Sequence, residues 1–166
     1  MFDKEALKNF LIENKDMPHT SKYHAETYLQ HVLCMVEKCI SIQPNNRALI
    51  AAVYCHDIGK PACHRFIEGK GNTFYNHEAK GADMLSTFIT TDDPDYAQIE
   101  FLVLNHMVPF QAKGPEPWAS YAQKQIAQFA SEYPAEWLAN LFTLNMLDSE
   151  KNPGTRDEEE LIKKYL

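Results

Sequence analysis

Residues 46–59 form the segment that most constrains the fold, because a helix over this range would be apolar on nearly every face. The segment contains an unbroken apolar run from Ala48 to Val53. A helix that is apolar all round is buried among other elements and does not lie on a surface. We therefore expect this segment to form the centre of the domain.

The rest of the chain also has helical periodicity. Apolar residues recur at spacings of three and four, as at Leu7, Phe10 and Leu11, which indicates amphipathic helices. Pro94 stands where a first helical residue would, and Thr155-Arg156-Asp157-Glu158 has the pattern of a capping box before a last helix. The expected helices cover residues 3–14, 21–42, 46–59, 75–90, 94–107, 118–132 and 134–149, with one more after the capping box.

The sequence shows no convincing strand pattern. Residues 60–72 are expected to form a loop, since Pro61, Gly69 and Gly71 interrupt the periodicity there. A chain of 166 residues without internal repeats is long enough for one buried core. We expect an all-α fold, a single-domain helical bundle of about seven or eight helices over residues 1–166.

Charge and composition exclude several classes of protein. The formal charge of −7 gives a surface that repels a phosphate backbone, so binding of extended nucleic acid is disfavoured. A bound metal could still attract a small anionic substrate. The N-terminus lacks the features of a signal peptide, and no run approaches the roughly 20 apolar residues of a membrane span. The four cysteines form no CxxC pair, so we expect reduced thiols and a cytoplasmic protein.

A polar motif ends the central apolar segment: Tyr54-Cys55-His56-Asp57-Ile58-Gly59-Lys60. Burial of an unpaired carboxylate is costly, so Asp57 requires a cation or several hydrogen-bond donors. A divalent metal ion would supply that cation. Alternatively, Asp57 accepts backbone N–H bonds at a capped helix end.

Other histidines and one aspartate occupy helix positions that are flanked by core residues. His24 and His31 lie two turns apart on one face of an expected helix, His77 opens another and His106 closes a third. Asp148 lies among apolar neighbours near the end of a fourth. Each of them alone could be a structural polar group. Together, imidazoles and carboxylates form a donor set suited to a divalent transition metal such as Mn, Fe, Zn, Ni or Co.

These residues resemble the HD superfamily of metal-dependent phosphohydrolases, which carry a His, a His-Asp pair and a distal Asp on a helical bundle. The matching residues are His31, His56-Asp57 and Asp148, and the resemblance covers about residues 21–152. It implies an HD-type bundle with these four residues as ligands of one metal ion. Because some members hold two ions, it also implies a second ion at His77 and His106, with Asp57 bridging.

Two motif blocks are similar to HD domains related to tRNA nucleotidyltransferases. One is Gly59-Lys60-Pro61, and the other is Phe74-Tyr75-Asn76-His77, followed by Gly81-Ala82. Asn76 departs from the pattern, since these relatives often carry Gly before the His. Asn105-His106 stands where the cyclic-dinucleotide phosphodiesterases usually have paired histidines, so that branch is set aside.

The resemblance also implies roles in catalysis. With Asp57 at the metal, Lys60 would contact the substrate phosphate, and His24 would protonate the leaving group or orient the substrate. His64 and Arg65 are further candidates for substrate binding. For Lys60, a solvated helix-end cation is the structural alternative, and His24 could equally be structural. His19 lies outside the motif and is interpreted as a surface residue.

Three functions follow as hypotheses. The first is hydrolysis of a small phosphate ester, such as a nucleotide or cyclic nucleotide, with one or two metal ions and a metal-activated water. The second is a diiron oxygenase that uses the same ligands to activate oxygen. The third is a non-catalytic module that binds metal and nucleotide. The sequence leaves the substrate, the metal and the oligomeric state open.

Overall fold

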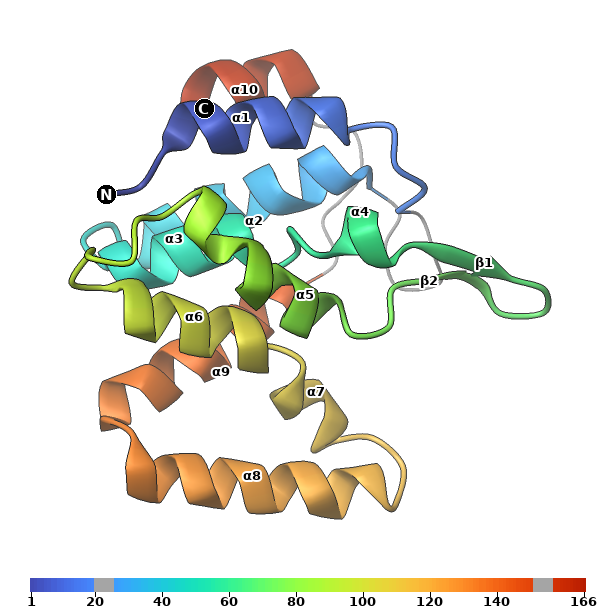
Figure 1. The fold of residues 1–166 in the computed structure, drawn as a ribbon, viewed down its shortest axis with the longest axis vertical. Coiled ribbons are helices and arrows are strands. Elements are labelled where there is room, and N and C mark those ends of the chain that lie inside the picture. The colour runs from blue at the N-terminus through green and yellow to red at the C-terminus, as the bar shows by residue number, and fades with distance from the viewer. Residues whose placement is uncertain (20–25, 151–156) are drawn as a thin grey trace.

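The computed structural model describes residues 1–19, 26–150 and 157–166, and within these ranges the chain is mostly helical (Figure 1). Eight of the helices described have eight residues or more, which confirms the predicted all-α fold. The helices are α1 (Lys4–Glu13), α2 (Tyr28–Ile42), α3 (Arg47–Cys55), α4 (Lys60–Cys63), α5 (His77–Met84), the 3-10 turn η1 (Leu85–Thr87), α6 (Tyr96–Asn105), α7 (Val108–Gln111), α8 (Trp118–Glu132), α9 (Ala135–Ser149) and α10 (Glu158–Tyr165).

Helix α3 lies at the centre of the fold, as its apolar composition predicts. It packs against α2 on one side and against α6 and α9 on others. Its side chains are almost all buried, and Leu49, Ala52, Val53 and Cys55 are fully so. Helices α1 and α10 lie at one end of the molecule and α8 at the other (Figure 1). No described helix combines the length and apolar content that a membrane crossing requires.

The ends of α2 and α3 differ from the prediction in a way that shapes the site. Helix α2 begins at Tyr28, because Thr27 and Gln30 form a reciprocal capping box there. Helix α3 ends at Cys55, four residues earlier than expected. His56 and Asp57 therefore lie in the turn that follows α3, where the backbone is no longer regular. At the last helix, Asp157 is the capping residue of α10, and Thr155 lies outside the described residues.

The expectation of a loop over residues 60–72 was wrong. A single turn, α4, is followed by an antiparallel hairpin of β1 (Arg65–Ile67) and β2 (Gly71–Thr73). The strands have three residues each, too few for an alternating pattern to stand out in the sequence. Gly69 and Gly71 have φ values of +79° and +80°, which glycine adopts at little cost in a tight connection. In Figure 1 the hairpin projects from the helical body beside α4.

Helix α5 is fixed against the turn that carries Asp57. A Cβ atom at Gly59 would lie 2.1 Å from the carbonyl oxygen of His77 and 2.6 Å from the backbone nitrogen of Gly81. Only glycine permits that approach. Asn76, the residue before α5, has a φ of +63°. Asparagine tolerates this left-handed conformation better than most residues, so Asn76 can replace the glycine of the family pattern.

Candidate metal centre

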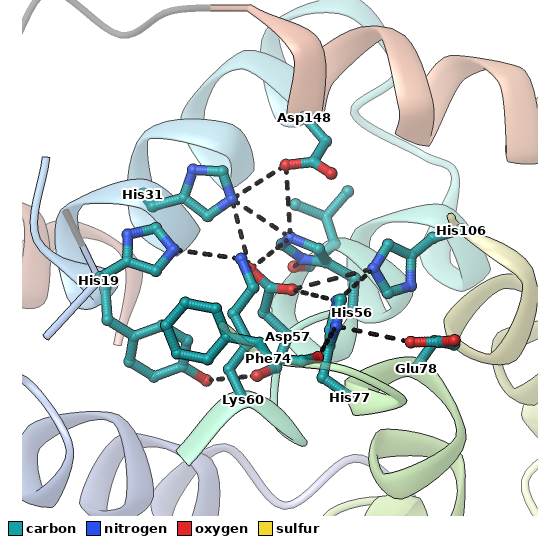
Figure 2. Close-up of polar contacts among 12 residues, drawn as sticks. His19, His31, His56, Asp57, Lys60, Phe74, His77, Glu78, His106 and Asp148 are labelled. Atoms are coloured by element: carbon teal, nitrogen blue, oxygen red, sulfur yellow. Dashed lines mark hydrogen bonds and ion pairs between the residues drawn. The ribbon is translucent and has the colours of Figure 1, made fainter. Parts of the chain in front are cut away.

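Six of the residues singled out in the sequence converge on one buried cluster (Figure 2). They come from distant parts of the chain and are brought together by the ends of several helices. Asp148 is 10% exposed, and the other five are at most 6% exposed. The members are His31 of α2, His56 and Asp57 of the turn after α3, His77 at the start of α5, His106 at the end of α6, and Asp148 of α9.

The cluster divides into two groups of potential metal ligands. His31, His56 and Asp148 form one, and Asp57, His77 and His106 form the other, with the ligand atoms of each group within 4.8 Å of one another. The carboxylate of Asp57 lies between the groups. Its Oδ2 is 3.2 Å from Nε2 of His56, and its Oδ1 is 3.3 Å from Nε2 of His77. The arrangement can therefore hold one ion in each group, with Asp57 shared.

Each imidazole of the cluster is oriented by a hydrogen bond from its Nδ1 atom to an oxygen on the outer side of the cluster. Nδ1 of His56, His77 and His106 lies 2.8 Å from the carbonyl oxygen three residues earlier in the chain. Val53 and Val103 offer such carbonyls because they lie in the last turns of α3 and α6, and Phe74 because it precedes the first turn of α5. Nδ1 of His31 lies 3.0 Å from Oε1 of Glu26. A carbonyl or carboxylate at this position fixes the proton on Nδ1 and leaves the Nε2 lone pair to face the cluster.

The Nε2 atoms then face each other in pairs. The distance is 3.3 Å between His31 and His56, and 3.0 Å between His77 and His106. Two nitrogen lone pairs at such distances repel unless a proton or a metal ion lies between or beside them. Oδ1 of Asp148 also faces the first pair and lies 3.1 Å from Nε2 of His31. Imidazole nitrogens and carboxylate oxygens that converge in this way form a donor set that fits a divalent transition metal.

The electrostatics of the cluster keep both carboxylates ionised. Burial raises the pKa of Asp57, but the charges of His56 and Lys60 outweigh this effect and hold that pKa well below its ordinary value. Burial likewise opposes ionisation of Asp148, and a hydrogen bond from His31 and the charge of His56 lower its pKa. The cluster is thus prepared to neutralise a cation.

Two of the histidines differ sharply in basicity. Burial lowers the pKa of His31, but hydrogen bonds to Asp148 and Glu26 outweigh it and raise the pKa to about 9. Burial and the charges of His77 and His56 lower the pKa of His106 to about 3. Without metal, His31 therefore holds a proton at neutral pH, whereas His106 is neutral and offers its lone pair.

Lys60 is buried at the edge of the cluster, so the interpretation as a solvated helix-end cation was wrong. Its side chain is 7% exposed, and Nζ lies 2.6 Å from Oδ2 of Asp57. Nζ also lies 3.2 Å from Nε2 of His19 and 5.6 Å from the ring centroid of Phe74. The site therefore contains a cation of its own beside the shared carboxylate (Figure 2).

The interpretation of His19 as a surface residue was also wrong, because it is only 1% exposed. Its Nδ1 lies 3.3 Å from the carbonyl oxygen of Glu26, and its ring centroid lies 5.1 Å from that of His31. His19 precedes α2 in a segment without regular structure. Such a segment has no periodicity, so its sequence gives no signal of burial.

Three more residues of the site were missed in the sequence. Glu26 orients His31, the hydroxyl of Tyr28 donates to the backbone oxygen of Asp57 at 3.2 Å, and Phe74 covers Lys60. Glu26 was assigned to a helix that in fact begins two residues later. An acidic residue directly before a capping box is the one sequence signal that could have revealed it.

The remaining candidates lie outside the cluster or outside the described residues. His64 lies at the base of the hairpin, where Nε2 is 2.9 Å from Oδ1 of Asn72 and the ring centroid is 5.5 Å from that of Phe74. Arg65 is exposed and donates from Nη1 to the backbone oxygen of His64 at 2.6 Å. His24 lies in the undescribed range 20–25. The roles of all three in catalysis or substrate binding stay predictions.

Comparison with known proteins agrees with this geometry. The family model described as HD domain matches residues 25–153, a range that includes all six residues of the cluster. Neither the curated proteins nor the solved structures gave a significant match. A family model that spans most of the chain and the whole buried cluster shows that the chain belongs to the HD domain family.

Proposed function

We propose that this chain is a metal-dependent phosphohydrolase that acts on a small phosphate ester, a nucleotide or cyclic nucleotide, through a metal-activated water. The observation that carries the proposal is the convergence of Nε2 atoms at 3.3 Å and 3.0 Å around Asp57, in a cluster with a buried lysine at its edge. Converging imidazoles and carboxylates suit metal ions, and the lysine suits an anionic substrate.

Two ions of Mn, Fe, Zn, Ni or Co fit the donor set. His31, His56 and Asp148 would hold one, His77 and His106 the other, and Asp57 would contribute an oxygen to each. Bound in this way, the ions would lower the pKa of a water molecule and polarise the phosphate. The outer hydrogen bonds from Nδ1 keep the imidazoles oriented for this task.

Lys60 would bind the phosphate in this mechanism. Its ammonium group has three protons. Two are directed to partners already described, Oδ2 of Asp57 and Nε2 of His19. The third proton has no acceptor among the described residues and can bind a phosphoryl oxygen. Phe74 shields the ammonium from water, and exclusion of water strengthens an ionic contact with phosphate.

The substrate we propose is nucleotide-sized, because a formal net charge of −7 opposes a long phosphate backbone. We also propose, from the two motif blocks at residues 59–61 and 74–82 alone, that the chain is related to the HD domains of the tRNA nucleotidyltransferase type. A cytoplasmic location is proposed as well, since the four cysteines form no CxxC pair in the sequence.

Metal analysis of the purified protein, coupled to a phosphate-release screen over nucleotides and cyclic nucleotides, tests the proposal. We expect about two transition-metal ions per chain and release of phosphate from at least one nucleotide. Removal of metal should abolish the release, and added metal should restore it. A protein that binds metal but hydrolyses nothing would overturn the proposal. Oxygen uptake by an iron-loaded form would point to the oxygenase instead.

A further inference from the structure

The hairpin β1–β2 has one face that begins at the site. Phe66 pairs with Asn72 in the ladder, so their side chains lie on the same face. His64 lies two residues before Phe66, and Phe74 lies two residues after Asn72, which by strand periodicity places both on that face too. Contacts support this placement: the ring of His64 lies against that of Phe74, and its Nε2 lies 2.9 Å from Oδ1 of Asn72.

This face is continuous with the cluster at its inner end. The ring of Phe74 lies 5.6 Å from Nζ of Lys60 and 6.3 Å from the ring of His19, measured to the centroids. Figure 2 shows Phe74 beside His19 and Lys60. From Lys60 outward, the order is thus Phe74, then His64 with Asn72, then Phe66.

The outer end of the face is an exposed aromatic ring. Phe66 is 73% exposed, and the hairpin projects from the helical body (Figure 1). Residues two apart on a strand are separated by about 7 Å, so Phe66 lies roughly that far beyond His64. Phe74 stands opposite His64 in the register and its ring lies 5.6 Å from Nζ of Lys60, so Phe66 is at most about 13 Å from that atom. A nucleotide covers this span when its phosphate contacts the ammonium group and its base stacks on the ring. A large apolar ring held in water on a two-stranded arm contributes little to folding.

We propose that this hairpin face, defined by Phe74, His64, Asn72 and Phe66, binds the base of the nucleotide substrate, with the base stacked on Phe66. The inference rests on the proposed function and narrows it from phosphate esters in general to those that carry a planar base. An aromatic ring next to neutral polar groups suits a base, since stacking needs a flat apolar partner and tolerates different bases. Arg65 and Ile67 alternate to the opposite face and would not contact the base.

Binding of analogues that resist hydrolysis tests the proposal directly. The probes are the phosphonates of adenosine, uridine and plain ribose in which CH2 replaces the 5′ ester oxygen, titrated into metal-loaded protein by calorimetry. Phe66→Ala should weaken binding of a nucleoside analogue about 5- to 150-fold, since one stacked base contributes about 1–3 kcal/mol. The same variant should leave the affinity for the ribose analogue unchanged.

Ile67 provides the matched control, because it is the next residue on the same strand and lies on the opposite face. Ile67→Ala should change no affinity more than about twofold, which is below 0.5 kcal/mol. Phe66→Trp should keep the affinity, and a nucleoside analogue should quench the fluorescence of the new ring. Ile67→Trp should show no such quenching, and both variants are read against the wild-type signal.

The outcomes separate the two proposals. If Phe66→Ala weakens the base-containing and base-free analogues equally, or neither of them, the base platform is wrong while the hydrolase proposal stands. If the wild-type protein binds no analogue and releases no phosphate from any nucleotide, both proposals are overturned.

Discussion

His19 and Lys60 are 41 residues apart in the chain, yet Nε2 of His19 lies 3.2 Å from Nζ of Lys60 in the interior of the protein. Lysine has no acceptor, so His19 must present a lone pair to the ammonium group. The other ring nitrogen, Nδ1, faces the carbonyl oxygen of Glu26 at 3.3 Å, which fixes the required tautomer. His19 is thus placed to position Lys60.

Replacement of His19 should therefore impair phosphate binding without loss of metal. A hydrogen bond to a charged group contributes about 1.5–3 kcal/mol, so His19→Ala should lower kcat/KM for a phosphate ester about 10- to 150-fold. His19→Gln should recover much of the loss, since its amide oxygen can accept from Lys60. Steady-state kinetics beside metal analysis checks this. Loss of metal in His19→Ala would mean that His19 is a ligand and not a positioning residue.

Asp57 is the residue on which both groups of ligands depend. Asp57→Asn keeps the size of the side chain but removes the charge shared by His56, His77 and Lys60. We expect bound metal to fall to background and phosphate release to stop, with Asp57→Ala giving the same result. Lys60→Ala is the contrasting variant: it should retain metal and weaken turnover. Full metal content in either Asp57 variant would disprove the ligand set.

Polar residues that stand among apolar helix positions are the part of the site that the sequence can predict. His31, Asp57 and Asp148 are visible because each is polar among apolar helix neighbours, and burial of such groups requires partners. The structure brings these residues together, and their role as ligands stays a prediction. His19 and Glu26 were missed for the opposite reason: they lie in irregular backbone before α2, where no periodic pattern exists against which they could stand out.

The turn after α3 shows a second limit of the sequence. In the sequence, Gly59 is visible only as part of the motif. The structure shows that a glycine is required there by a tertiary contact, because the backbone of α5 occupies the space that a side chain would fill. A contact between residues far apart in sequence leaves no local periodicity. The hairpin β1–β2 was not predicted for a related reason. Contacts between its two arms, such as that between His64 and Phe74, are not visible as a local sequence pattern.

Gly59→Ala should both destabilise the fold and disturb the site. The added Cβ would lie 2.1 Å from the carbonyl oxygen of His77, and backbone cannot move aside as a flexible side chain can. We expect a loss of at least about 1–3 kcal/mol in the free energy of unfolding, the usual cost of overpacking. Urea denaturation measures this loss, and metal analysis should show weaker binding because His77 is displaced.

Gly81→Ala is a graded comparison for that experiment. Its Cβ would lie 3.3 Å from a side-chain methyl of Val103, a contact that a small adjustment relieves. It should therefore cost clearly less than Gly59→Ala. Equal costs for the two variants would show that the tight approach at Gly59 does not set the stability of this region.

The basicity of His31 makes metal binding depend on pH. In the metal-free protein its pKa is about 9: burial lowers it, but the bonds to Asp148 and Glu26 outweigh burial. A metal ion needs the neutral imidazole, so at pH 7.5 binding should release about one proton from His31. His106 should release none, because burial and the charges of neighbouring histidines keep its pKa near 3. Calorimetric titration of metal into the metal-free protein, in buffers of different ionisation enthalpy, gives the number of protons released on binding.

The same shift predicts how stability depends on pH in the presence of a chelator. The pKa of His31 is higher in the folded state than the ordinary value of 6.5, so its protonation stabilises the fold below pH 6.5. That contribution, on the order of 3 kcal/mol, is lost as the pH rises from about 6.5 to 9. Urea denaturation of the metal-free protein should show this decline, and His31→Gln should lack it. A metal-free protein whose stability is constant over this range, with no proton released on metal binding, would mean that His31 does not hold the proton between the two carboxylates.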